Sequence, residues 1–213
     1  QVANKIGNGA YGCVWQATII ESMEDVVVKV VWPDFDLDPD DVKEHGEATE
    51  ERLEAFRREI EMMELAGSHP KIVKLLGATH DSRVIVLEEA LSDLHTVIKN
   101  QAGSLHLSMI SKWTRDVLEA LHYLHSVNIV HRDVKPGNIL IFDSMVAKLG
   151  DFGMSREFVS HEKMAVGREI CTLWYRAPEL LMGAAKYCPK IDVWAVGCLV
   201  MEMLIGNSIF KGN

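Results

Sequence analysis

The sequence predicts an α+β fold with two unequal lobes, because strand-like segments come first and helical segments follow. Four segments that are rich in valine or alternate in polarity predict strands: residues 13–20, 24–31, 72–76 and 83–87. Apolar residues spaced three or four positions apart predict amphipathic helices at 53–63 and 108–126. An apolar run predicts a third helix at 193–204, buried nearly all round. We therefore expect one domain, with a sheet-rich lobe at 1–90 and a helical lobe at 91–213.

Composition indicates a soluble globular protein. Of the 213 residues, 48% are hydrophobic and 25% are charged, and no apolar run approaches the roughly 20 residues that span a bilayer. The N-terminal residues show no leader with a basic start and an apolar centre, so we expect no secretion signal. The four cysteines lack Cys-x-x-Cys spacing, which argues against a zinc site or a disulfide framework. These features favour an intracellular location, cytoplasmic or nuclear, and no membrane partner.

All of the net charge lies in one segment. The chain has a formal net charge of −9, and residues 34–64 hold 13 acidic and 4 basic residues, which also gives −9. We favour a solvated acidic insertion followed by an exposed helix face, and a docking site for a basic partner is the alternative. Nucleic acid is not an expected partner, because binding a phosphate backbone needs a basic stripe that the sequence does not show.

A glycine-rich turn stands near the start of the chain. Gly7, Gly9 and Gly12 form a Gly-x-Gly-x-x-Gly pattern, which is a weak signal by itself. A dinucleotide-binding turn would open a helix, whereas here a strand signal containing Val14 follows. Glycines let such a turn approach phosphate groups closely without side-chain clashes.

Lys29 ends a run of three valines on a predicted strand. A charge on a buried strand is costly unless it is paired. Its expected partner is Glu59 on the helix at 53–63, and the alternative is that Glu59 is one surface glutamate among many.

The most specific motif runs from His131 to Asn138, His-Arg-Asp-Val-Lys-Pro-Gly-Asn, and is followed by Asp151-Phe-Gly. Phosphoryl transfer requires an acceptor for the proton of the attacking hydroxyl, ligands for a metal ion and a cation for the developing charge. Asp133 would accept the proton, Lys135 would supply the positive charge, and Asn138 and Asp151 would hold magnesium. The alternative is that the two aspartates are solvated turn residues.

These motifs resemble those of eukaryotic protein kinase domains over the whole chain. The segment 172–179, Thr-Leu-Trp-Tyr-Arg-Ala-Pro-Glu, and the run around Asp192 narrow the resemblance to the cyclin-dependent and mitogen-activated kinase group, most like a cyclin-dependent kinase. The resemblance implies a bilobal kinase fold in which residues 1–90 bind ATP and residues 91–213 form part of the catalytic lobe. On this resemblance we expect the chain to be a fragment.

The resemblance also implies individual roles. Lys135 and Thr172 resemble residues of serine/threonine kinases, and Arg176 is similar to the residue that accompanies a preference for proline after the target. Leu87 is implied to be the gatekeeper beside the hinge, and His131, Phe152 and Met63 are implied to stack in a hydrophobic spine. The residues implied to contact ATP are Ile6, Gly7, Gly9, Gly12, Val14, Val27, Lys29, Leu87, Glu88, Ala90, Asp93 and Leu140.

Three arginines are implied to grip a phosphothreonine of the activation segment: Arg58, Arg132 and Arg156. The position expected for that threonine is Gly167, so an anion of another kind is needed. We hypothesise that Glu162 or Glu169 supplies it, with phosphorylated Ser160 or an acidic group of a partner as alternatives. Tyr11 matches an inhibitory phosphorylation site, whose usual neighbouring threonine is replaced by Ala10.

The resemblance thus implies a serine/threonine protein kinase that is proline-directed and uses ATP and Mg²⁺. Its expected partners are protein substrates and a cyclin-like or other activating protein. The alternative function is that of a catalytically inactive pseudokinase or scaffold.

Overall fold

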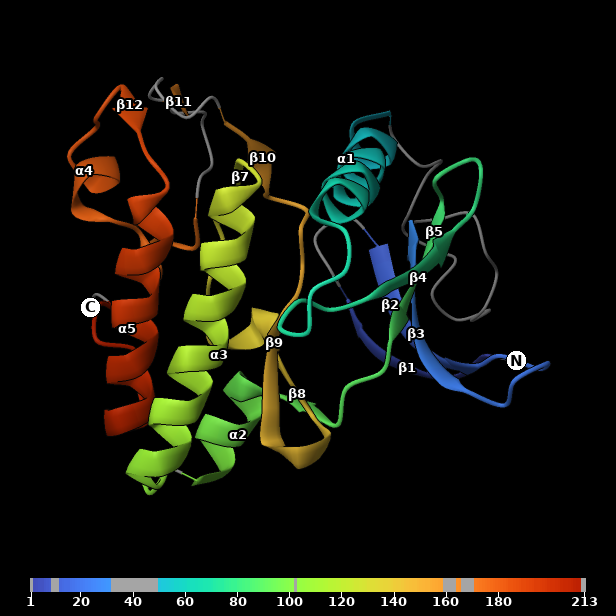
Figure 1. The fold of residues 1–213 in the computed structure, drawn as a ribbon, viewed down its shortest axis with the longest axis horizontal. Helices are drawn as coiled ribbons and strands as arrows, with labels where there is room; N and C mark the ends of the chain where they lie inside the picture. The colour runs from blue at the N-terminus through green and yellow to red at the C-terminus, as the bar shows by residue number, and fades with distance from the viewer. Residues whose placement is uncertain are drawn as a thin grey trace. The chain divides into compact units, whose positions relative to one another are not determined.

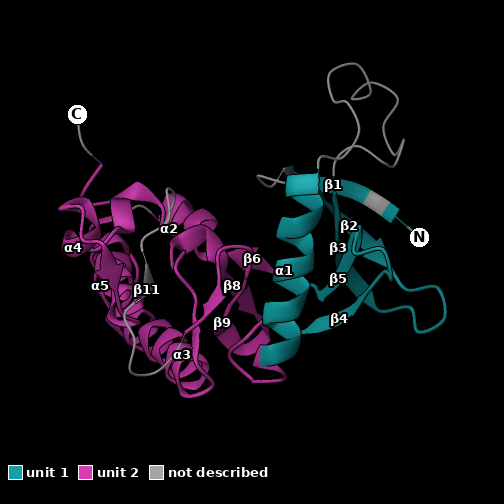
Figure 2. Ribbon diagram, turned by 90° about the horizontal axis from the view of Figure 1, so that it is seen from above, with its two compact units in different colours: residues 1–65, 74–89 teal, residues 66–73, 90–213 magenta. Residues whose placement is uncertain are grey.

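The computed structural model describes residues 2–8, 12–31, 50–101, 103–158, 164–165 and 171–211. The chain forms two compact units, unit 1 with residues 1–65 and 74–89, and unit 2 with residues 66–73 and 90–213 (Figure 2). Each unit combines strands with helical segments, so the predicted α+β class is confirmed.

Unit 1 is built on an antiparallel sheet in the strand order β1-β2-β3-β5-β4 (Figure 1). The strands are β1 Val2–Asn8, β2 Gly12–Thr18, β3 Asp25–Val31, β4 Leu75–Ala78 and β5 Val84–Glu88. Helix α1 spans Glu50–Ala66. The stripe that predicted this helix is at most 9% exposed at each position: Leu53, Phe56, Ile60 and Met63. The apolar side of α1 is therefore buried as predicted.

Unit 2 is mostly helical. Its helices are α2 Leu94–Gln101, α3 Leu107–Ser126, α4 Pro178–Leu181 and α5 Lys190–Ile205. Three strands form a small sheet in the order β6 Ser92–Asp93, β8 Ile139–Phe142 and β9 Val146–Leu149. Two strand pairs complete the unit: β7 Ile129–Val130 with β10 Arg156–Glu157, and β11 Met164–Ala165 with β12 Lys186–Tyr187. Helices α3 and α5 lie side by side, and the stripe of α3 that includes Trp113, Val117 and Leu121 is buried (Figure 1).

Two predictions need correction. The strand predicted at 72–76 is found as Leu75–Ala78, because Ile72 instead bridges Leu149 in unit 2. Helix α5 exists as predicted, but it is not buried nearly all round. Five of its apolar side chains are 39–49% exposed: Val193, Trp194, Met201, Leu204 and Ile205. The helix is apolar on every side, and the described residues cover only part of its circumference.

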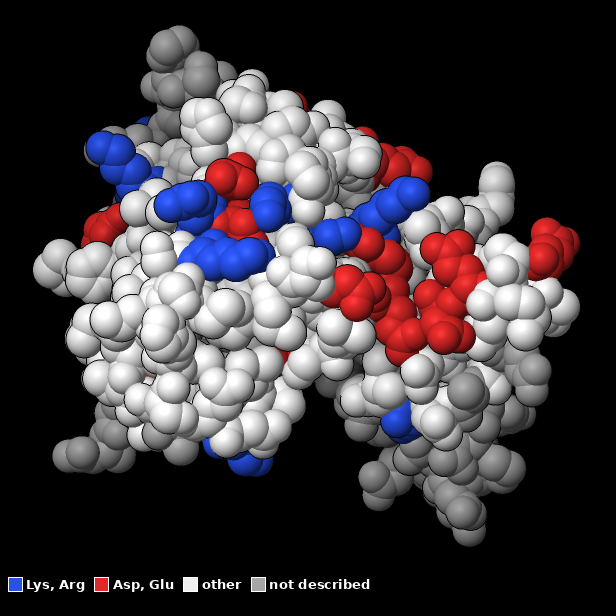
Figure 3. All heavy atoms as spheres, turned by 60° about the horizontal axis from the view of Figure 1, so that its bottom comes forward, with Lys and Arg blue, Asp and Glu red and all other residues white. Residues whose placement is uncertain are grey.

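On the face shown in Figure 3, basic and acidic side chains lie together on one part, and acidic side chains gather on the right-hand part. One pairing is resolved in detail in unit 2, where Asp116 is 4% exposed and lies 2.6 Å from Lys71 and 3.4 Å from Lys112. The backbone N–H of Ala147 also donates to this carboxylate, at 3.0 Å. A buried carboxylate needs such partners. Its bonds therefore join the start of unit 2 to α3 and β9.

None of the described helices is long and apolar enough to cross a membrane. Within the same residues, no group of three His, Cys, Asp or Glu side chains is arranged to hold a metal ion.

Gly12 occupies a position in β2 that has no room for a side chain. A Cβ there would collide with the carbonyl group of Val30 and lie 3.0 Å from the ring of Phe56, whereas a Cβ on Gly7 would meet nothing within 4 Å. We expect Gly12→Ala to lower the free energy of unfolding by about 2–3 kcal/mol, because β2 must separate from β3. The matched control, Gly7→Ala, should change it by less than about 0.5 kcal/mol. Chemical denaturation of both variants tests this, and equal midpoints would contradict it.

Candidate active site

Asp133 is the centre of a hydrogen-bonded network in the loop that follows β7. The residue is 7% exposed. Lys135 Nζ and Asn138 Nδ2 donate to Oδ2 at 2.6 and 3.0 Å. The hydroxyl and the backbone N–H of Thr172 donate to Oδ1 at 2.7 and 3.1 Å. The structure thus brings together four residues that the sequence singled out, although Thr172 lies 39 positions from Asp133.

Asp192, in the first turn of α5, holds the backbone of this loop. Its buried carboxylate accepts the N–H groups of His131 and Arg132 at 2.9 and 2.8 Å. His125 Nε2 lies 2.8 Å from the same carboxylate. Arg132 has φ 69°, a left-handed conformation that is unfavourable for a residue with a side chain. The hydrogen bond to Asp192 fixes Arg132 in this conformation next to Asp133.

His131 links the loop to the Asp-Phe-Gly segment. Its Nδ1 accepts the N–H of Asp133 at 3.3 Å, so its Nε2 carries the proton and donates to the carbonyl of Gly150 at 3.0 Å. The ring also meets Phe152 edge-on, with 5.3 Å between centroids. Two members of the predicted spine are thus in contact, and the third, Met63, is buried in unit 1.

Asn138 and Asp151 are brought close by the backbone, because the N–H of Gly150 donates to the carbonyl of Asn138 at 2.9 Å. The side-chain Nδ2 of Asn138 is engaged by Asp133, which leaves Oδ1 as its ligand atom. Asp151 is exposed and has φ 60°. One amide oxygen and one carboxylate suit Mg²⁺, which takes few protein ligands and completes its shell with water and phosphate. The residues present therefore fit this ion.

In unit 1, Lys29 Nζ lies 2.6 Å from Glu59 Oε1. The side chains are 17% and 5% exposed, respectively, so the pair is largely buried. The structure therefore joins β3 to α1 through the two residues that the sequence paired.

Three of the remaining predicted ATP contacts of unit 1, Val14, Val27 and Leu87, lie on one face of its sheet. In the antiparallel register, Val14 lies opposite Lys29 and Val27 opposite Leu87, so these side chains share a side with Lys29. Gly7 lies opposite Val14. Ile6 is 54% exposed on β1. Glu88 follows Leu87 and accepts the N–H of Lys74 with its side chain, at 2.8 Å. Gly9 lies outside the described residues.

In unit 2, Asp93 and Leu140 are opposite one another in the register of β6 and β8, and Ala90 precedes β6. The carboxylate of Asp93 accepts the N–H and hydroxyl of Thr96 at 2.8 and 2.7 Å. Asp93 therefore caps the start of α2, a contact that sequence reasoning missed although Asp is a common N-cap residue.

Comparison with known proteins gives the family. The sequence profile described as the protein kinase domain matches residues 1–213, the whole chain. The chain belongs to the protein kinase domain family.

Relatives of this kinase domain come from the group that the motifs predicted. Mitogen-activated protein kinase 15 of Xenopus laevis and extracellular signal-regulated kinase 2 of Dictyostelium discoideum are each 36% identical over 224 residues. Cyclin-dependent kinase 20 of Danio rerio is 34% identical over 219 residues. Each match covers 100% of this chain, but the chain spans only 35%, 56% and 59% of the respective relatives. The predicted resemblance to cyclin-dependent and mitogen-activated kinases is confirmed.

The three predicted regulatory arginines of the kinase domain have these partners. On α1, Arg58 lies 3.4 Å from Glu54. In unit 2, Arg132 Nε donates to the carbonyl of Met154, and Arg156 Nη1 donates to those of Gly153 and Ser155. Arg132 and Arg156 thus bind three consecutive carbonyls after Asp151. The other predicted regulatory residues lie outside the described residues: Ala10, Tyr11, Ser160, Glu162, Gly167 and Glu169.

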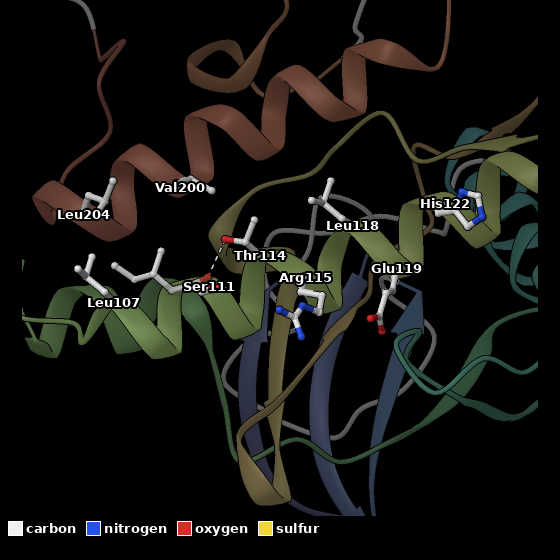
Figure 4. Close-up of a pocket in the computed structure, with 10 residues that line it drawn as sticks. Leu107, Ser111, Thr114, Arg115, Leu118, Glu119, His122, Val200 and Leu204 are labelled. Atoms are coloured by element: carbon white, nitrogen blue, oxygen red, sulfur yellow. Dashed lines mark hydrogen bonds between the residues drawn. The ribbon is translucent and has the colours of Figure 1, made fainter.

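A hollow of about 690 Å³ lies between α3 and α5 of the kinase domain (Figure 4). Leu107, Leu118 and Leu204 supply apolar surface, and Arg115 and Glu119 lie along α3 beside it. None of the predicted site residues lines this hollow. It is therefore separate from the candidate active site.

The environment of Asp133 stabilises its carboxylate form. Burial alone would raise the pKa of Asp133, but the hydrogen bond and charge of Lys135, together with the hydroxyl of Thr172, outweigh burial and hold that pKa below 3.8. The charged form therefore stabilises the fold at neutral pH, and this contribution is lost as the pH falls through the lowered pKa.

Thr172→Val should raise the pKa of Asp133, because it removes the hydroxyl donor at 2.7 Å. The acid-unfolding midpoint should then move to higher pH, whereas Thr172→Ser, which keeps the hydroxyl, should leave it near wild type. Circular dichroism during acid titration measures both midpoints. A midpoint for Thr172→Val at or below the wild-type value would contradict the assignment.

Proposed function

We propose that this protein is a serine/threonine kinase that transfers the γ-phosphoryl group of ATP to a hydroxyl of a protein substrate. The observation that carries the proposal is the carboxylate of Asp133, held by Lys135, Asn138 and Thr172. In this proposal residues 1–90 act as the ATP-binding lobe and residues 91–213 as part of the catalytic lobe. Membership of the kinase domain family supports both parts.

Each residue of the network suits one task in the transfer. Asp133 is ionised at neutral pH and can accept the proton of the substrate hydroxyl. Lys135, 2.6 Å from that carboxylate, is placed to offset charge on the transferred group. Lys29, fixed by Glu59, would hold the ATP phosphates under the turn that includes Gly7.

The other ATP contacts would bind the nucleotide base and sugar. Val14, Val27 and Leu87 share one face of the unit 1 sheet and can pack on an adenine ring. Asn138 and Asp151 would hold Mg²⁺, which neutralises phosphate charge when bound. Arg132 and Asp192 do not contact the reactants in this proposal and keep the loop in shape.

The function is tested by Asp133→Asn in the full-length protein. Asparagine keeps the size of the side chain but cannot accept the proton, so kcat should fall more than tenfold, a change of about 1.4 kcal/mol or more in the barrier. ATP affinity, measured by calorimetry, should stay within about twofold, because Asp133 acts on the hydroxyl. ATP binding without turnover by the wild-type protein would instead favour the pseudokinase function.

Proline after the target residue is the second part of the proposal. Cys171, directly before Thr172, has φ 63°, and its carbonyl accepts Arg176 Nη2 at 2.9 Å. This carbonyl is therefore occupied beside the place where a substrate hydroxyl would meet Asp133. An N–H group on the next substrate residue would lose that acceptor, and an unpaired buried N–H costs about 1–3 kcal/mol. Proline has no N–H to satisfy.

Substrate peptides test this explanation directly. Replacing proline by alanine after the target should lower kcat/KM by about 5- to 150-fold, which corresponds to 1–3 kcal/mol. N-methylalanine also lacks the N–H but has no ring, so it should restore most of the loss. If N-methylalanine is as poor as alanine, the ring rather than the absent N–H decides the preference.

The proposal extends to partners and location by analogy with the group. Protein substrates and a cyclin-like or other activating protein are the proposed partners, and the cytoplasm or nucleus is the proposed location. One of the similar proteins is named as a cyclin-dependent kinase, and this similarity supports the proposal of a cyclin-like activating protein.

A further inference from the structure

The guanidinium of Arg132 is held from two sides. Its Nε donates to the carbonyl of Met154 at 2.6 Å, and its Nη1 donates to the hydroxyl of Tyr187 at 2.9 Å. Arg132 is 7% exposed and Tyr187 is 2% exposed. Hydrogen bonds from a charged donor are stronger than those between neutral groups, and burial strengthens them further.

Tyr187 is itself firmly placed. It lies in β12, whose backbone pairs with β11, and its partner in the register is Met164. Tyr187 also belongs to a buried apolar cluster with Val130, Leu180 and Ile191. A tyrosine with a buried ring and a bonded hydroxyl makes a rigid anchor for a polar group.

Arg132, which donates to the hydroxyl of Tyr187, is connected to two parts of the candidate active site. Arg132 directly precedes Asp133 and is held at φ 69° by Asp192. Met154, its other acceptor, directly follows the Asp-Phe-Gly segment that contains Asp151. A residue in this conformation persists only where its surroundings hold it, so contacts on both its backbone and its side chain matter.

We propose that Tyr187 is a positioning residue, whose hydroxyl holds Arg132 and thereby aligns Asp133 with the segment after Asp151. This inference rests on the proposed kinase function. It assigns the anchoring of Arg132 to a neutral hydroxyl built into the fold. In this proposal, the alignment of Asp133 does not require a phosphate on the activation segment.

The first test is Tyr187→Phe in the full-length protein. The ring and its apolar contacts remain, and only the acceptor for Arg132 is lost. We expect kcat to fall about tenfold while KM for ATP and for the peptide stays within about twofold, because alignment of the loop matters in the transition state. Phosphatase treatment of wild-type enzyme should leave kcat within about twofold. A strong loss on dephosphorylation would overturn the proposal.

A double-mutant cycle separates positioning from a general structural effect. In Arg132→Ala the guanidinium is absent, so adding Tyr187→Phe should cause almost no further loss of kcat. Tyr123→Phe is the matched control, because Tyr123 also donates one partly buried hydrogen bond, to the carbonyl of Ala66 at 2.6 Å, and lies on α3 rather than in the loop that contains Asp133. Its effect on kcat should be small, and the same with and without Arg132. Full additivity of Tyr187→Phe with Arg132→Ala would refute the proposal.

Hydrogen exchange gives a readout that does not depend on turnover. Tyr187→Phe should speed exchange of the amides of Arg132 and Asp133 at least severalfold, whereas Tyr123→Phe should leave them unchanged. A wild-type protein that shows no turnover would contradict the proposed function, and the exchange data would still decide whether Tyr187 positions this loop. Unchanged exchange in Tyr187→Phe would overturn the inference whatever the activity.

Discussion

The buried carboxylate of Asp192 is the interaction on which the candidate active site depends. It is 1% exposed and accepts two backbone N–H groups from the loop that contains Asp133. Its place in the first turn of α5 favours a negative charge, because the dipole of a helix is positive at its N-terminal end. A buried charge without these bonds would be very costly. The position of the loop is thus tied to the packing of the helix in the core of unit 2.

Local motifs predicted the parts of the site that depend on short sequence distances. Asp133, Lys135 and Asn138 lie within six residues, so their spacing alone indicates that they act together. Lys29 and Glu59 could be paired because a lysine on a valine-rich strand needs an acid and the following helix offers one. The apolar stripe of α3 could also be predicted from short sequence distances, because apolar residues three or four positions apart recur along the whole helix.

Contacts that join distant segments could not be read from the sequence. Tyr187 lies 55 residues from Arg132, and nothing in its neighbours indicates a hydrogen bond to an arginine. Gln16 donates to Glu89 at 2.6 Å across 73 residues, which only the sheet register explains. The prediction that α5 is buried nearly all round was also wrong. An evenly apolar sequence shows that a helix can be buried, but it does not show how much of the helix the described residues cover.

The network around Asp133 also bears on what the site rejects. A carboxylate has about four lone-pair positions, and Asp133 receives four side-chain or backbone donors at 2.6–3.1 Å. A hydroxyl that is to react must therefore displace one of these donors. A protein substrate can do so with the help of its other contacts, whereas a lone water molecule brings none. In the proposed transfer reaction, a carboxylate with all of its acceptor positions filled would disfavour hydrolysis of ATP while no substrate is bound.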